Sequence, residues 1–166
     1  MTAVEPHSLP RLHLNPGALL VTRQAQWVVT VLGSCVAVTM FDRASGLAAI
    51  CHAMLPRAPG SALPASDDEQ RLRYVGQVLP AMLALFQDRG VRRGRIETKL
   101  FGGANMFTWR EPRVGDYKIG EANVAAVRQL LEREGLQVAA ENTGGRRGRK
   151  IFFNTGTGEV LHQFIR

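Results

Sequence analysis

Residues 27–56 read W-V-V-T-V-L-G-S-C-V-A-V-T-M-F-D-R-A-S-G-L-A-A-I-C-H-A-M-L-P, and this segment is the most informative about the fold. It contains both cysteines of the chain and one of its four histidines. Its apolar, β-prone runs predict strands at Trp27–Leu32, Val36–Phe41 and Leu47–Met54. The D-R-A-S-G stretch predicts a turn between the last two.

Further strands are expected toward both ends of the chain, with helices between them. Leu19–Thr22 is short and apolar, and Lys150–Asn154, a T-G-T-G turn and Glu159–Ile165 read as a hairpin. Strands, helix, strand, helix and strands form an α+β pattern. We therefore expect an N-terminal arm over residues 1–14 and one α+β domain over residues 15–166, with antiparallel or mixed sheets packed against two main helices.

The first helix is predicted from Ser66 to about Arg89. Ser66 and Glu69 have the spacing of a capping box, in which each side chain satisfies a backbone amide at the helix start. Pro80 lacks an amide donor and predicts a kink near Gly76. The expected buried stripe consists of Leu72, Val75, Leu79, Met82, Leu83 and Phe86.

The second helix is predicted from Glu121 to Glu134, with Gly135 at its end. Its inward-facing residues are expected to be Val124, Val127, Leu130 and Leu131. A Glu121 carboxylate in the first turn favours the helix dipole.

Composition indicates one globular, cytoplasmic domain. The chain has 166 residues, of which 45% are apolar and 21% charged. No apolar run is long enough to span a bilayer, so membrane insertion is not expected. The start, M-T-A-V-E-P-H-S-L-P, lacks the basic end and apolar core of a secretory signal. In the cytoplasm both cysteines would be reduced.

The charge balance is basic, with 21 Lys and Arg against 14 Asp and Glu and a net charge of +7. The excess is clustered at Arg92–Arg95 and Arg146–Lys150. An acidic protein surface, nucleic acid or a merely solvated basic face would each account for it. No helix-turn-helix, zinc-knuckle or RNA-recognition signature accompanies the charge, so nucleic acid is not the expected partner.

Cys35 is the candidate nucleophile. Gly33 and Ser34 before it permit a tight bend, which can display a thiol at a strand end and leave its amide free to face an oxyanion. His52 lies on a strand expected to pair nearby and has the side chain suited to act as its base. The alternative is a buried, inert thiol, which is the commoner state of a free cysteine. Cys51 points away from His52 on a strand, so at most one of these two faces a shared site.

Six short stretches follow one another at a spacing that is typical of one protein family. L-G-S-C-V-A-V is followed by H-A-M-L-P, and T-G-E-V-L stands near the C-terminus. Between them are K-L-F-G-G-A-N-M at Lys99–Met106, I-G-E-A-N-V at Ile119–Val124 and E-N-T-G-G-R-R-G-R-K at Glu141–Lys150. Together these stretches resemble the CheD family, the chemoreceptor glutamine deamidases of bacterial chemotaxis, and the resemblance covers about Asn15 to Val160. It implies a cysteine-hydrolase fold related to that of the cytotoxic-necrotising-factor deamidases.

The resemblance also implies roles for individual residues. Cys35 would be the nucleophile and His52 its base, and Thr30 is the match for a threonine that orients the histidine. Some family members carry that threonine one position earlier, where this chain has Val29. Backbone amides around Gly33 and Ser34 would hold the oxyanion. No metal or other cofactor is implied, and the cysteines and histidines show no zinc-site spacing.

The implied activity is conversion of glutamine side chains to glutamate on the cytoplasmic helices of methyl-accepting chemotaxis receptors, with hydrolysis of glutamate methyl esters as a second reaction. The family resemblance leaves an alternative open. In it the protein is a regulator that binds receptors or a CheC-type phosphatase, with catalysis weak or lost. Intact Cys35 and His52 favour the enzyme, because a pure adaptor would not need that pair.

Overall fold

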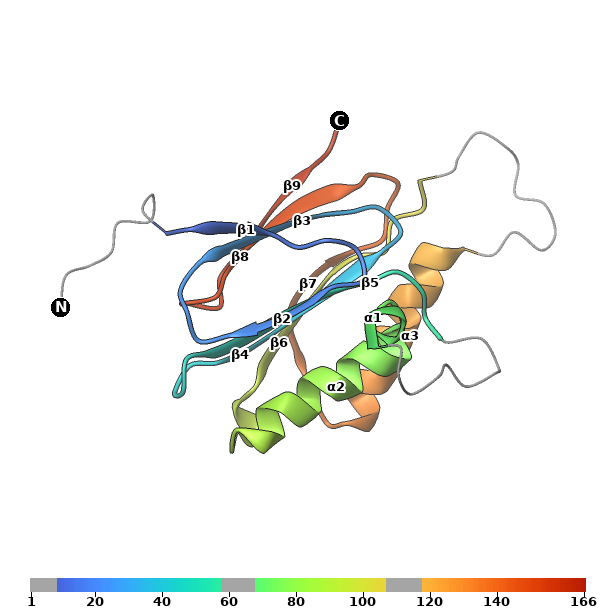
Figure 1. Cartoon of the computed structure of the whole chain (residues 1–166). Coiled ribbons are helices and arrows are strands. Elements are labelled where there is room, and N and C mark those ends of the chain that lie inside the picture. Colours follow the sequence, from blue (N-terminus) through green and yellow to red (C-terminus); the bar gives the residue numbers. More distant parts are fainter. Residues whose placement is uncertain (1–8, 58–67, 107–117) are drawn as a thin grey trace.

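The computed structural model describes residues 9–57, 68–106 and 118–166 and arranges them in three layers (Figure 1). The outer sheet has the strand order β1-β3-β8-β9 and the central sheet the order β2-β5-β4-β6-β7. The outer sheet consists of β1 (Arg11–His13), β3 (Trp27–Leu32), β8 (Arg149–Asn154) and β9 (Val160–Phe164). The central sheet consists of β2 (Leu19–Thr22), β4 (Val36–Asp42), β5 (Leu47–Ala53), β6 (Glu97–Gly102) and β7 (Val138–Thr143).

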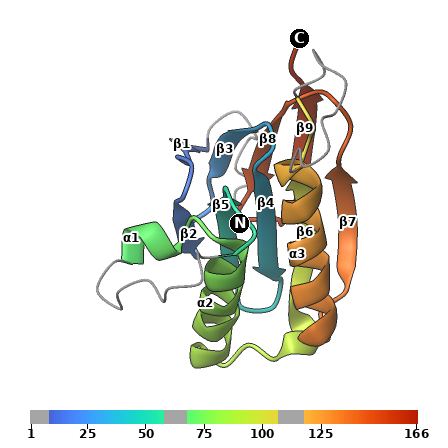
Figure 2. The ribbon, with the colours of Figure 1, turned by 90° about the vertical axis from the view of Figure 1, so that its right-hand side faces the viewer.

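The helices form the third layer, on the face of the central sheet that is turned away from the outer sheet. They are α1 (Asp68–Arg71), α2 (Val75–Asp88) and α3 (Ile119–Arg133), with a short 3-10 turn at Arg93–Arg95. Figure 2 shows α2 and α3 side by side across the central strands. The α+β architecture with two main helices is therefore confirmed.

Strand alternation divides the interior into two apolar layers. On β4, Val36, Val38 and Met40 face the helices, whereas Ala37 and Phe41 face the outer sheet. The helix-side layer is completed by the buried faces of α2 and α3, including all four inward residues predicted for the second helix. The inter-sheet layer includes Val28 and Leu32 of β3 and Ile50 of β5. A residue's position along a central strand thus determines which layer its side chain enters.

The strands of residues 27–56 agree closely with the prediction. β3 has the predicted bounds, and β4 and β5 differ from them by one residue at the C-terminal end. Gly46 supplies a positive φ of 70° in the turn between β4 and β5. The antiparallel ladder pairs Val36 with Ala53 and Asp42 with Leu47. The C-terminal hairpin is also present, because β8 pairs with β9 antiparallel.

The single helix predicted from Ser66 to Arg89 is wrong. Ser66 lies outside the described residues, and the helix is interrupted between α1 and α2. Tyr74 is extended, with φ −104° and ψ 129°, and forms a parallel bridge with Leu55. The amides of Met54 and Leu55 both donate to the Arg73 carbonyl. Pairing with the segment at Leu55 replaces the helical hydrogen bonds between α1 and α2. The helical periodicity of residues 66–89 contains no information about this pairing.

Pro80 lies in the second turn of α2, which continues through it. The interruption at residues 72–74 precedes Gly76, so it is not the kink that Pro80 predicted. Pro80 is the sixth residue of α2, so the helix lacks one internal hydrogen bond, the one that an amide at this position would donate to the Gly76 carbonyl.

Residues 11–13, which the sequence reading assigned to the arm, form β1 and pair parallel with β3. Leu14 follows them and is only 4% exposed. Its amide donates to the Val29 carbonyl at 2.9 Å. This pairing fixes the Leu14 carbonyl beside β3, where it takes part in the site described below.

Within the described residues, no helix has the length and apolar character needed to cross a membrane.

Candidate active site

Cys35 and His52 lie on the same face of the central sheet. The β4–β5 register places Ala37 opposite His52, and Cys35 stands two residues before Ala37. Cys35 packs against the inter-sheet apolar layer, as Ala37 does. In an antiparallel pair such a diagonal separation is about 7–8 Å between Cα atoms, which side chains can bridge. The sheet therefore brings the thiol and the imidazole to one end of the space between the two sheets.

Thr30 reaches His52 from the opposite sheet. Its hydroxyl lies 2.7 Å from His52 Nδ1, and both residues are almost fully buried. Thr30 points inward because it shares a face of β3 with the inward residues Val28 and Leu32, whereas Val29 points to the other face. The β3–β8 ladder runs without a register shift through this position. Thr30 is therefore the residue of this pair that contacts His52.

The hydrogen bonds of Thr30 determine the tautomer of His52. The hydroxyl donates its single proton to the Leu14 carbonyl at 2.8 Å. It can then only accept from the imidazole, so His52 Nδ1 carries a proton. In the neutral ring, Nε2 is left as the basic nitrogen.

Burial keeps His52 neutral. It lowers the pKa of His52 to about 4, and the nearby charge of His13 acts in the same direction. His13 is the last residue of β1 and directly precedes the Leu14 carbonyl that holds Thr30. At neutral pH the ring is therefore a proton acceptor and not a cation.

The two cysteines are free thiols in different environments. Cys35 is half-buried, and burial raises its pKa while its own backbone amide opposes the rise. Cys51 is fully buried in the helix-side layer, and burial raises its pKa to about 12. Only Cys35 combines partial exposure with the face that carries His52. The prediction that Cys51 and His52 point to opposite sides of the strand is confirmed.

The end of β6 holds the Cys35 loop by backbone hydrogen bonds. The amide of Gly103 donates to the Cys35 carbonyl at 2.8 Å, and that of Ala104 donates to the Gly33 carbonyl at 2.9 Å. A Cβ atom on Gly102 would lie 2.3 Å from the Cys35 carbonyl oxygen. The glycines of the K-L-F-G-G-A-N-M stretch thus allow the end of β6 to approach this loop closely.

Replacing Gly102 by alanine is expected to destabilise the protein by more than replacing Gly46. Both have positive φ, 104° and 70°, so each alanine carries backbone strain of roughly 1–2 kcal/mol. Gly46 has open space around it, whereas Gly102 has backbone at its side. We expect an additional loss of about 1–3 kcal/mol for Gly102→Ala from this overlap. Urea unfolding measures the loss of unfolding free energy in each variant. Equal losses would contradict the close approach of Gly102 to the Cys35 carbonyl.

Sequence analysis did not predict the hydrogen bonds that the side chain of Asn123, on α3, makes beside Cys35. Its Nδ2 donates to the carbonyls of Ser34 and Met54, each at 3.0 Å, and its side chain is fully buried. It thereby joins the loop before Cys35 to the residue that follows β5. Gly120 allows this approach, because a Cβ atom there would lie 2.6 Å from the carbonyl oxygens of Gly103 and Ala104. The sequence did contain a signal for this role, because Asn123 is a polar residue on the otherwise apolar inward face of α3.

Arg149 differs from the solvated basic face considered for Arg146–Lys150. It is only 1% exposed, and its guanidinium donates to the carbonyls of Asn142 and Gly144. The Gly144 amide in turn donates to the Gly102 carbonyl at 2.9 Å. Arg149 therefore stabilises the segment that supports the end of β6.

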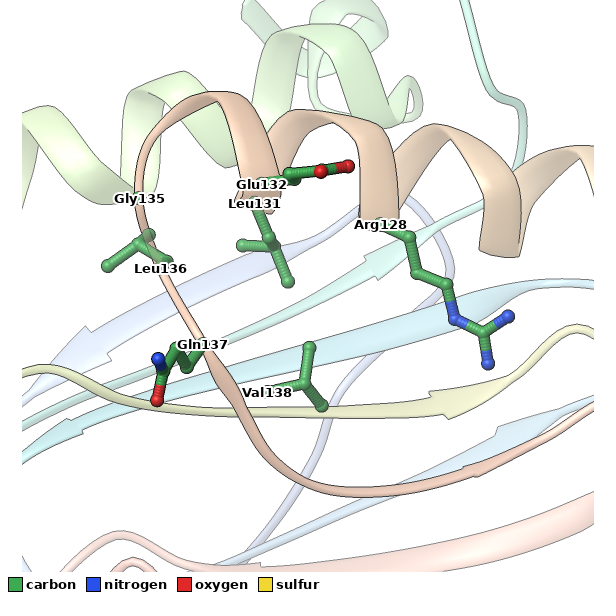
Figure 3. Close-up of a pocket in the computed structure, with 7 residues that line it drawn as sticks. All are labelled: Arg128, Leu131, Glu132, Gly135, Leu136, Gln137 and Val138. Carbon is green, nitrogen blue, oxygen red and sulfur yellow. The ribbon is translucent and has the colours of Figure 1, made fainter.

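The hollow shown in Figure 3 is separate from Cys35 and His52. It lies between the C-terminal end of α3 and the start of β7 and is lined by Arg128, Leu131, Glu132, Gly135, Leu136, Gln137 and Val138. From Asn123 to Gly135 the chain advances about 18 Å at the usual helical rise. The residues that line this hollow include neither Cys35 nor His52.

Comparison with known proteins identifies the family. The family model described as "CheD chemotactic sensory transduction" matches residues 54–163. The probable chemoreceptor glutamine deamidase CheD 2 of Geobacter sulfurreducens is 47% identical over 161 residues, which are 97% of this chain and 93% of that protein. The corresponding protein of Oleidesulfovibrio alaskensis is 42% identical over 93% of this chain and 75% of its own length. That of Pyrococcus abyssi is 37% identical over 78% of this chain and 76% of its own length. With matches that extend over nearly the whole sequence, the chain belongs to the CheD family.

Proposed function

We propose that this protein is a chemoreceptor glutamine deamidase that hydrolyses glutamine side chains through a thioester on Cys35. The observation that carries the proposal is the hydrogen-bonded Thr30–His52 pair facing the same inter-sheet space as a partly exposed thiol. The relatives named above are deamidases by name and match this chain over most of its length. A basic surface with a net charge of +7 suits an encounter with an acidic protein partner.

The first half-reaction acylates the enzyme. His52 Nε2 takes the proton of the Cys35 thiol as the sulfur attacks the amide carbon of the glutamine side chain. His52 then donates that proton to the amide nitrogen, the carbon–nitrogen bond breaks, and ammonia leaves. Thr30 keeps Nδ1 protonated throughout, so the proton always moves on Nε2.

The second half-reaction releases glutamate. Water gives a proton to His52 Nε2 and its oxygen attacks the thioester carbon. The carbon–sulfur bond breaks, and the sulfur recovers the proton from His52. The sum is glutamine and water giving glutamate and ammonia, with no electron transfer. A glutamate methyl ester would follow the same steps and lose methanol in place of ammonia.

The oxyanion of each tetrahedral intermediate needs hydrogen-bond donors. We assign this role to the backbone amides of the Ser34–Cys35 bend, which lie beside the sulfur. The Cys35 amide already interacts with its own sulfur atom. That places the donor next to the atom that forms the new bond.

Receptors are the proposed partners, and their cytoplasmic helices are the proposed substrates, which puts the reaction in the cytoplasm. Binding to a CheC-type phosphatase stays a prediction from the family resemblance.

The test is peptide mass spectrometry of a chemoreceptor cytoplasmic fragment incubated with the wild-type protein. We expect specific glutamines to gain about one mass unit, with one ammonia released for each conversion. A fragment incubated without the protein controls for spontaneous deamidation. A receptor fragment that binds the protein yet stays unmodified would overturn the proposal.

A further inference from the structure

Among the described residues, Asn123 is the only residue of α3 whose side chain hydrogen-bonds to the Ser34–Cys35 bend. Its amide nitrogen has two protons, and each is used on a different carbonyl, those of Ser34 and Met54. The two bonds fix the amide orientation, because the Oδ1 atom could not accept from a carbonyl. One side chain thus connects the bend before the nucleophile to the end of the strand that carries His52.

The bond to Ser34 orients more than the Ser34 carbonyl. That carbonyl and the Cys35 amide belong to one peptide unit, which is planar and trans. The C=O and N–H of such a unit point in opposite directions. With the Ser34 oxygen directed at α3, the Cys35 N–H is directed away from the helix. Accepting a hydrogen bond at the oxygen also polarises the N–H and makes it a stronger donor.

An asparagine at position 123 lowers the stability of the fold in a way that an apolar side chain would not. Asn123 is fully buried, and its Oδ1 has no hydrogen-bond partner among the described residues. An unpaired buried acceptor is destabilising, and an apolar side chain would continue the inward stripe of Val124 and Val127. The two donated bonds are what the amide adds at this position.

We propose that Asn123 is a positioning residue for deamidation, which holds the Ser34–Cys35 peptide so that the Cys35 amide points at the oxyanion. The inference rests on the proposed function and adds to it the source of the donor's orientation. Both hydrogen bonds of the Asn123 side chain go to backbone carbonyls, and neither goes to the thiol or the imidazole. It acts through the backbone of the bend, and the bond to Met54 keeps that bend in register with β5.

The experiment compares Asn123→Ala with Asn154→Ala in the full-length protein. Asn154 is also a buried asparagine, and its Oδ1 accepts from the Gly156 amide in the turn after β8. It pairs with Trp27 at the start of β3, whereas the Cys35 bend follows Leu32 at its end. The five residue steps from Trp27 to Leu32 correspond to about 17 Å along a strand. Asn154→Ala therefore reports the effect of losing a buried amide remote from the bend.

Three measurements separate positioning from general damage. For Asn123→Ala we expect kcat for deamidation to fall about 10- to 100-fold with KM nearly unchanged, which approaches the loss of an oxyanion donor. We expect alkylation of Cys35 by iodoacetamide to change by less than about threefold, because that displacement forms no oxyanion. The Cys35 amide resonance in a ¹⁵N–¹H spectrum should shift in Asn123→Ala and stay in place in Asn154→Ala.

Two results would overturn the inference while leaving the deamidase intact. One is equal kcat values for the two alanine variants. The other is a parallel loss of alkylation and deamidation in Asn123→Ala, which would mean that the whole site had collapsed. If the wild type does not deamidate receptors, the proposed function fails by itself. The Cys35 amide resonance then decides the positioning role: a selective shift supports it, and no shift refutes it.

Discussion

The free energy of unfolding of the wild type is expected to fall as pH drops from 7 to 4, and His52→Gln is expected to remove about 3 kcal/mol of that fall. The pKa of His52 is about 4 in the folded protein and about 6.5 in an unfolded chain. Between these values the unfolded state binds more protons than the folded state. Stability therefore rises with pH across this range and is lost as pH falls through it.

Carboxylates also titrate as pH approaches 4, so the wild type alone does not report on His52. Comparison of the wild type with His52→Gln isolates the contribution of His52. Asp42 is an example, since its bonds with Arg95 and Ser45 hold its pKa low against the effect of burial. Urea unfolding of the wild type and of His52→Gln at several pH values gives the difference directly. His162→Gln is the matched control, because it makes the same change at a histidine that is exposed on β9. A His52→Gln slope equal to that of the wild type would show that His52 is not buried as a neutral ring.

Thr30→Val is expected to lower kcat for deamidation by roughly 100-fold or more, the range for losing an effective general base. Valine keeps the shape of threonine but leaves His52 Nδ1 and the Leu14 carbonyl without their shared partner. The imidazole is then free to rotate or to carry its proton on Nε2, where it cannot accept one from Cys35. Each unpaired buried group should also cost roughly 1–3 kcal/mol of stability.

Thr30→Ser is the rescue variant, because it restores the hydroxyl without the methyl group. Its kcat should return to within about tenfold of the wild type if the hydrogen bond, rather than packing, carries the effect. Steady-state kinetics on a receptor fragment, with unfolding measured in parallel, tests this. If Thr30→Val retained full activity, the tautomer argument would be refuted.

The strands and the facing of their side chains were predictable because they depend on local alternation. Once β5 was recognised, parity alone put His52 and Cys51 on opposite faces. It did not decide between Val29 and Thr30, because both faces of β3 carry apolar residues. The family resemblance then gave Cys35 and His52 their proposed roles. The contact between Thr30 and His52 joins residues of two sheets, and neighbouring residues do not specify how the sheets stack.

What the sequence did not reveal depends on partners far along the chain. Asn123 bonds to carbonyls 89 and 69 positions away, and the helix break at residues 72–74 arises from pairing with Leu55. Arg149 appeared to belong to a solvated basic run, but its guanidinium is buried against the carbonyls of Asn142 and Gly144. In each case, hydrogen bonding to the backbone of a segment distant in the sequence outweighs the structure that the neighbouring residues favour. Backbone acceptors are present at every residue, so composition gives no sign of which one is used.

The most direct test of the account is receptor deamidation by Cys35→Ala beside Cys51→Ala. The two thiols lie on opposite faces of the same sheet, and both are free. We expect Cys51→Ala to convert the same receptor glutamines to glutamate as the wild type, and Cys35→Ala to convert none above the spontaneous rate. Conversion by Cys35→Ala at the wild-type rate would contradict the assignment of Cys35 as the nucleophile and, with it, the role of His52.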